Sequence, residues 1–200
     1  MLNTLLISTS YLPCINTISS CAKHNGPIRI ENNQYFVKHF MHNRAHIISP
    51  NGVLNLTIPI VKHNKTKTKI KDIEISNSYN WKNIHLKAIY MNYKNSPFYS
   101  FYQEEFIRLY QRNYRYLIDI NNDALNLILK LLDISIQLSS TICYKQNYAA
   151  GVIDFRNRID DKQIKPYNQV FEDKVGFINN VSIIDLLFNQ GPIATNIILE

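Results

Sequence analysis

The first part of the chain contains a strand, a proline turn, a helix and a second strand, and this order constrains the fold most. Leu5–Ser8 is a short apolar run typical of a buried strand. The turn at Tyr11–Pro13 precedes a helical segment at residues 15–24, which Asn25-Gly26 ends. Residues 27–31 read as the second strand. Two strands joined by one helix within about 30 residues favour a parallel βαβ unit, so the sequence predicts an α/β fold.

A β-hairpin is expected next, because Arg44–Ser49 and Val53–Val61 flank an Asn51-Gly52 turn. Pro59 cannot donate a ladder hydrogen bond, which places that end of the hairpin at a sheet edge. Residues 71–76 alternate and predict one more strand. The predicted architecture is therefore a βαβ-like unit and a hairpin in a mixed sheet.

The second half of the chain is predicted to be mainly helical. From Asn80 the apolar residues follow the spacing of one helix face. Further helices are expected at residues 101–112, at 123–134 with Asn121 or Asn122 as N-cap, and at 182–188, and a strand at 138–144. Ser182 and Asp185 have the spacing of a capping box. We expect a single domain over residues 1–200, with possible lobes at 1–78 and 79–200.

Composition limits the function classes. The net charge of +7 suggests an anionic partner, but the chain is rich in Asn, Ile, Lys and Tyr, as expected from A/T-rich codons. The basic loop has no interleaved aromatic residues, so no nucleic-acid partner is expected; its lysines are Lys62, Lys65, Lys67, Lys69 and Lys71. An RNA-binding function rests on charge alone.

Neither a membrane segment nor a disulfide framework is predicted. No apolar run approaches the roughly 20 residues of a spanning helix, and the N-terminal residues lack a charged leader. Cys14, Cys21 and Cys143 fit reduced thiols in a cytoplasmic protein. His39, His42 and His46 are unevenly spaced, so no metal site is predicted, and no cofactor is indicated.

Several strings, in this order along the chain, resemble the WbqC-like family. They are Tyr11-Leu12-Pro13, Lys38, Asn43-Arg44, Thr57-Ile58-Pro59-Ile60, Trp81-x-x-x-His85, Tyr93, Ser96-Pro97-Phe98, Tyr167-x-Gln169-Val170-Phe171 and residues 176–192. The chain departs from the family where Ser8-Thr9-Ser10 replaces a more polar turn, and Glu31 is the candidate for an acidic residue after the second strand. The resemblance implies a bacterial protein of O-antigen (lipopolysaccharide) or capsule biosynthesis, with modification of an activated amino sugar as the expected activity.

His85 is the candidate catalytic residue, because Trp81 lies one turn away on the same helix face and can desolvate the imidazole. Such an imidazole is suited to general base catalysis near neutral pH. The alternative is a core histidine with a structural hydrogen bond.

The candidate substrate-binding residues are Tyr11, Lys38, Asn43, Arg44 and Trp81. Arg44 can grip a phosphate or carboxylate in bidentate fashion while Asn43 orients it. Tyr11 and Cys14 follow the first strand, where open α/β sheets bind nucleotides. Asp154, Arg156, Asp185 and Asn189 are candidates for a second polar site, unless Asp185 only caps its helix.

Two functions follow. The first is transfer of an acyl or aminoacyl group to a nucleotide-linked amino sugar, with a sugar nucleotide or another anionic small molecule as ligand. The second is a non-catalytic sugar-nucleotide-binding or scaffold protein that assists a partner transferase.

Overall fold

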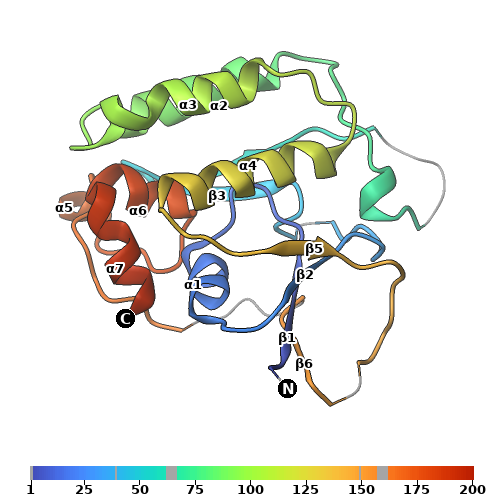
Figure 1. Cartoon of the computed structure of the whole chain (residues 1–200). Helices are drawn as coiled ribbons and strands as arrows, with labels where there is room; N and C mark the ends of the chain where they lie inside the picture. Colours follow the sequence, from blue (N-terminus) through green and yellow to red (C-terminus); the bar gives the residue numbers. More distant parts are fainter. Residues whose placement is uncertain (1, 39, 62–66, 149, 157–161) are drawn as a thin grey trace.

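The predicted βαβ unit is confirmed and lies at the centre of a parallel sheet. β1 (Thr4–Ser8) and β2 (Ile28–Glu31) pair in parallel and are joined by α1 (Ile15–Lys23). β5 (Leu138–Ser140) and β6 (Val152–Asp154) extend the sheet to the strand order β5-β2-β1-β6 (Figure 1). The computed structural model describes residues 2–38, 40–61, 67–148, 150–156 and 162–200.

The predicted hairpin is also confirmed, and it forms its own two-stranded sheet. β3 (Arg44–Ser49) and β4 (Gly52–Thr57) pair in antiparallel register around the Asn-Gly turn. The α/β class therefore holds. The strand predicted at residues 71–76 was wrong: η1 (Ile70–Asp72) is a 3-10 helix, followed only by isolated bridges at Glu74 and Ile75.

The helices of the second half form two groups (Figure 1). α2 (Trp81–Tyr93) and α3 (Tyr99–Gln111) lie side by side, and α4 (Leu117–Leu131) lies between them and the parallel sheet. The short elements after residue 170 gather beside α1; they are α5 (Glu172–Val175), α6 (Ile183–Gln190), η2 (Gly191–Ile193) and α7 (Ala194–Leu199). None of the helices in the described ranges is long and apolar enough to cross a membrane.

The start of α4 differs from the sequence prediction. The helix begins at Leu117, so Asn121 is inside it rather than at its N-cap. The Asn121 amide donates to the backbone carbonyl of His42 (2.8 Å) and to the Thr9 hydroxyl (3.2 Å). Asn121 is buried, so its amide links the helix to the two loops at the end of the sheet.

The turn after β1 is held by the C-terminal part of the chain. The Ser182 hydroxyl donates to the carbonyl of Leu12 (2.9 Å), and the backbone amide of Ile183 donates to the carbonyl of Pro13 (2.9 Å). Leu12 adopts a φ of 41°, a left-handed conformation that costs about 1–3 kcal/mol in a residue other than glycine. These bonds hold the turn in that conformation.

One hydrophobic core runs through the described chain, from Leu5 in β1 to Ile198 in α7. Its fully buried members include Tyr11, Trp81 and Phe188. Residues on both sides of position 78 contribute to this core, and the division into two lobes stays a prediction.

Candidate functional site

Polar side chains gather at the carboxyl edge of the parallel sheet. Because the strands are parallel, their last residues meet there: Ser8 pairs in register with Glu31, and Leu6 pairs with Asp154. In open α/β sheets ligands bind outside this edge, where the strand order changes direction. Here the chain builds outward from β1 to β2 and β5, then returns to place β6 on the other side of β1. The change of direction therefore falls at the end of β1.

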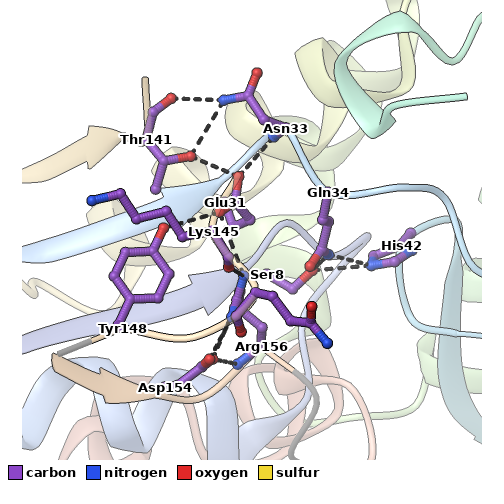
Figure 2. Close-up of polar contacts among 11 residues, drawn as sticks. Ser8, Glu31, Asn33, Gln34, His42, Thr141, Lys145, Tyr148, Asp154 and Arg156 are labelled. Carbon is purple, nitrogen blue, oxygen red and sulfur yellow. Dashed lines mark hydrogen bonds and ion pairs between the residues drawn. The ribbon is translucent and has the colours of Figure 1, made fainter. Parts of the chain in front are cut away.

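Glu31 is the acidic centre of this edge and is fully buried (Figure 2). Its carboxylate accepts hydrogen bonds from the Asn33 amide nitrogen (2.8 Å) and the Thr141 hydroxyl (2.7 Å). It also pairs with Arg156, whose Nη1 lies 3.6 Å from Oε2. A buried carboxylate needs such partners, because its desolvation is costly.

Arg156 joins this carboxylate to the segment between β5 and β6. The guanidinium is 3% exposed and lies 2.5 Å from Oδ2 of Asp154. It also donates to the carbonyls of Lys145 (2.8 Å) and Gln146 (3.1 Å) and stacks on two tyrosine rings. Arg156 thereby fixes residues 144–148 at the end of the sheet.

Ser8, Gln34 and His42 form a second buried cluster beside this one (Figure 2). The Ser8 Oγ lies 3.0 Å from Nε2 of His42, and the Gln34 amide nitrogen lies 2.8 Å from the same atom. An amide nitrogen can only donate, so His42 Nε2 is an acceptor. The Gln34 amide also donates to Ser8 Oγ, so the serine hydroxyl and the Gln34 amide both face the single lone pair of Nε2. Burial lowers the pKa of His42 to about 4, so the imidazole is neutral at neutral pH.

A small pocket opens at this edge, next to Ser8. Its volume is about 90 Å³. Apolar walls come from Ile7, Phe40, Met41 and Phe155, and polar groups from Ser8, Ser10, Cys14, Thr17, His46, Arg156 and Asn180. Pockets for drug-sized ligands are roughly 300–1,000 Å³, so this one has room for a small group only.

The first turn of α1 is already occupied by the protein. The amide of Ile15 donates to the Val181 carbonyl (3.0 Å), and the amide of Asn16 donates to Oδ1 of Asn180 (3.0 Å). Cys14, at the N-cap, lies 3.2 Å from the Thr17 hydroxyl. The expected ligand position after β1 thus carries a pocket, while these two helix amides are bound within the chain.

Three of the predicted site residues meet in the core instead. Nδ1 of His85 lies 2.9 Å from the Tyr11 hydroxyl, and Trp81 packs edge-on against the imidazole at 5.3 Å between centroids. His85 is 4% exposed, and Tyr11 also bonds to the Tyr110 hydroxyl. Burial lowers the pKa of His85 to about 4. The predicted contact between Trp81 and His85 is present, and the catalytic role of His85 stays a prediction.

The predicted anion-binding residues differ in burial and in the hydrogen bonds that their side chains already make. Asn43 is buried and its amide donates to the Ile58 carbonyl (2.8 Å), whereas Lys38 is exposed. Nε of Arg44 is buried and makes no hydrogen bond within the described residues. His46, two residues further along β3, lines the pocket; burial and the nearby Arg44 charge lower its pKa.

The proposed second polar site divides into two places. Asp154 and Arg156 belong to the sheet edge, while Asp185 is buried in α6 and accepts from the Tyr167 hydroxyl (2.7 Å). Neither Ser182 nor Asp185 forms the predicted capping box, because the Ser182 hydroxyl bonds to Leu12.

Sequence reasoning missed the pairing of Ser8 with His42. In the sequence, His42 is a candidate for metal binding only, together with His39 and His46. His39 lies outside the described residues, and so do Lys62 and Lys65 of the basic loop. Within the described part of the chain, no group of three or more His, Cys, Asp or Glu residues could hold a metal ion.

The fold and the site define an α/β protein with a buried polar cluster and a small pocket at the carboxyl edge of a parallel sheet. The chain belongs to the WbqC-like protein family, whose match covers residues 9–164 of 200. The strings at 167–192 lie beyond that match. No curated protein and no solved structure matches the chain.

Proposed function

We propose that this chain transfers an acyl group to the amine of a nucleotide-linked amino sugar, in the biosynthesis of a bacterial surface polysaccharide. The observation that carries the proposal is the pocket at the end of β1, which places Ser8, His46 and Arg156 around a small apolar cavity. Membership of the WbqC-like family supports the biosynthetic setting.

The pocket size suggests how the substrates are divided. A cavity of about 90 Å³ accepts an acyl group of a few carbons but not a sugar nucleotide. We therefore expect the nucleotide to lie outside the pocket, with its diphosphate near Arg44 and Lys38. Arg44 suits this role because the residue is partly exposed and its guanidinium can donate several hydrogen bonds to a phosphate.

His46 is suited to receive the proton of the amine. Its pKa is lowered by burial and by Arg44, so the imidazole is neutral at neutral pH. In the reaction the amine nitrogen forms a bond to the acyl carbonyl carbon, and the bond to the leaving group of an activated acyl donor breaks. The amine proton passes to His46 and then to solvent.

The test is a transfer assay with purified protein, acyl thioesters of two to eight carbons and a panel of sugar nucleotides with and without a free amine. We expect product only with an amino sugar and a short acyl chain. Arg44→Ala should weaken nucleotide binding by about 10- to 100-fold, since it removes charged hydrogen bonds. Arg108→Ala is the matched control, because Arg108 is an exposed arginine whose ion pairs among the described residues are with Glu104 and Glu105 on α3.

Nucleotide binding without transfer to any amino sugar would contradict the enzymatic proposal. That outcome would favour the alternative, a binding or scaffold protein that assists a partner transferase.

A further inference from the structure

Ser8 has the surroundings of a nucleophile. It is the last residue of β1, it lines the pocket, and its Oγ lies 3.0 Å from Nε2 of His42. A serine hydroxyl becomes an effective nucleophile when an adjacent base accepts its proton, and a third group usually orients that base. Here the Gln34 amide contacts Nε2 of His42, and the Asn121 amide holds the backbone carbonyl of His42.

His42 is held firmly enough to serve as that base. The Phe36 and Phe40 rings pack against the imidazole at 5.8 and 4.7 Å between centroids. Asn121 binds the His42 carbonyl, and the Gln34 amide donates to Nε2. His42 is 1% exposed, so water does not compete for the Nε2 lone pair, which Ser8 shares with the Gln34 amide.

The pocket supplies a place for the group that would become attached. Ile7 and Phe155 come from the ends of β1 and β6, while Phe40 and Met41 come from the loop before His42. These walls are apolar and the volume is about 90 Å³, which matches a short aliphatic chain.

We infer that Ser8 carries the acyl group as a covalent ester, with His42 as its general base and the adjacent pocket holding a short aliphatic chain. This inference rests on the proposed acyl transfer and adds its route, its nucleophile and the class of donor.

The first half of the reaction uses an acyl thioester. Ser8 Oγ forms a bond to the carbonyl carbon, the carbon–sulfur bond breaks, and the hydroxyl proton passes through His42 to the leaving thiolate. In the second half the amine attacks the ester carbonyl carbon. The carbon–nitrogen bond forms, the carbon–oxygen bond breaks, and the amine proton passes through His42, in place of His46, to Ser8 Oγ.

The test needs no sugar. The full chain is incubated with p-nitrophenyl acetate, p-nitrophenyl octanoate and acetyl-coenzyme A, then quenched in acid and analysed by intact mass and peptide mapping. We expect a burst of one equivalent of p-nitrophenol with the acetate, one acetyl group on Ser8, and a much slower reaction with the octanoate. His42→Gln should slow the acetylation by about 100-fold or more.

Controls separate Ser8 from other nucleophiles and from misfolding. Cys14 lines the same pocket and Cys143 is exposed, but a thioester on cysteine is cleaved by neutral hydroxylamine, whereas an ester on serine resists it. Ser49→Ala removes a hydroxyl in the hairpin and should leave acetylation unchanged. Ser8→Ala should abolish acetylation while keeping the thermal unfolding transition of the parent protein, and Ser8→Cys should restore an adduct that is now sensitive to hydroxylamine.

Acetylation on Cys14 or on scattered lysines, or no adduct from any donor, would overturn the inference. So would amino-sugar transfer that persists in Ser8→Ala, which would leave the proposed function intact as direct transfer. Acetylation of Ser8 without transfer to any amino sugar would leave the covalent step standing and refute the proposed acceptor.

Discussion

His42 Nε2 lies 3.0 Å from Ser8 Oγ, although 34 positions separate the two residues in the chain. The contact depends on two other segments: Gln34 from the loop after β2, and Asn121 from within α4. Gln34 contacts both side chains of the pair and Asn121 binds the backbone carbonyl of His42, so the geometry of the candidate site depends on the packing of α4 against the sheet.

Asn121→Ala should destabilise the protein and loosen His42. The change leaves the buried His42 carbonyl without its donor, at a cost of about 1–3 kcal/mol in the free energy of unfolding. Urea denaturation measures this cost. Asn126→Ala is the control, because Asn126 is exposed on the same helix and its loss should change stability by about 0.5 kcal/mol or less. Equal effects of the two changes would contradict the structural role of Asn121.

Glu31→Ala should be far more damaging than loss of a surface carboxylate. It removes the more distant of the two carboxylates beside the buried Arg156 and the acceptor for Asn33 and Thr141, and because Asp154 remains paired with Arg156 we expect a cost of about 2–3 kcal/mol. Glu104→Ala removes an exposed partner of Arg108 and should cost about 1 kcal/mol or less. Chemical denaturation of both variants decides the matter, and a mild effect at Glu31 would refute a structural pairing with Arg156.

Asp185→Asn should stabilise the protein above neutral pH. Burial raises the pKa of Asp185 to about 6, so the folded state binds this proton more tightly than the unfolded state does. The associated stability is present below the ordinary pKa of an aspartate and is lost as the pH rises through about 6. A rise of about two pKa units corresponds to a loss of about 3 kcal/mol in the free energy of unfolding at about pH 8. The uncharged amide of Asp185→Asn would avoid this loss at about pH 8, and it would bring no gain at about pH 4. Unfolding curves of both proteins at those pH values test this.

His85→Gln should reduce the acid sensitivity of the fold. Burial lowers the pKa of His85 to about 4, so the unfolded state binds the proton more tightly and stability falls as the pH drops from about 6.5 to about 4. The glutamine variant lacks this contribution and should lose less stability over that interval. The transfer assay at neutral pH then tests the catalytic prediction: a large rate loss without a change in melting temperature would support catalysis by His85.

Gly191→Ala should destabilise the end of α6 for two reasons. Gly191 has a φ of 54°, and an added Cβ would lie 2.4 Å from Cδ1 of Phe98. Backbone strain alone costs about 1–3 kcal/mol, and the overlap adds to it. Gly52→Ala isolates the strain, because Gly52 has a φ of 99° and nothing within 4 Å of the added carbon. Thermal melts should show a larger fall in melting temperature for Gly191→Ala than for Gly52→Ala, because only the first adds a steric overlap. An equal fall for the two variants would refute the clash with Phe98.

Local patterns predicted the elements whose stability is local. The turn at Gly52 and the helix face containing Trp81 depend on residues close in sequence, and both are confirmed. β6 was missed because three residues carry no periodic signal and become a strand only by pairing with β1. The start of α4 was misplaced because Asn121 has the residue type of a cap, while its real partners lie in other segments.

The sequence predicted the position of the pocket but not the buried residues beside it. The position after the first strand was predicted from the βαβ order, and a pocket lies there. Ser8 and His42 did not stand out, because a serine and a histidine 34 positions apart have no sequence signature as a pair. The Trp81–His85 spacing was clear but describes a contact within the core.

The bonds from Ser182 and Ile183 to the turn after β1 also bear on when the site can form. They join positions 170 residues apart, so the turn cannot reach its final conformation until residues 182 and 183 have emerged from the ribosome. A nascent or prematurely terminated chain would present β1 without a fixed turn at its end. The pocket beside this turn therefore forms only after residue 183 has been synthesised, long after β1 itself.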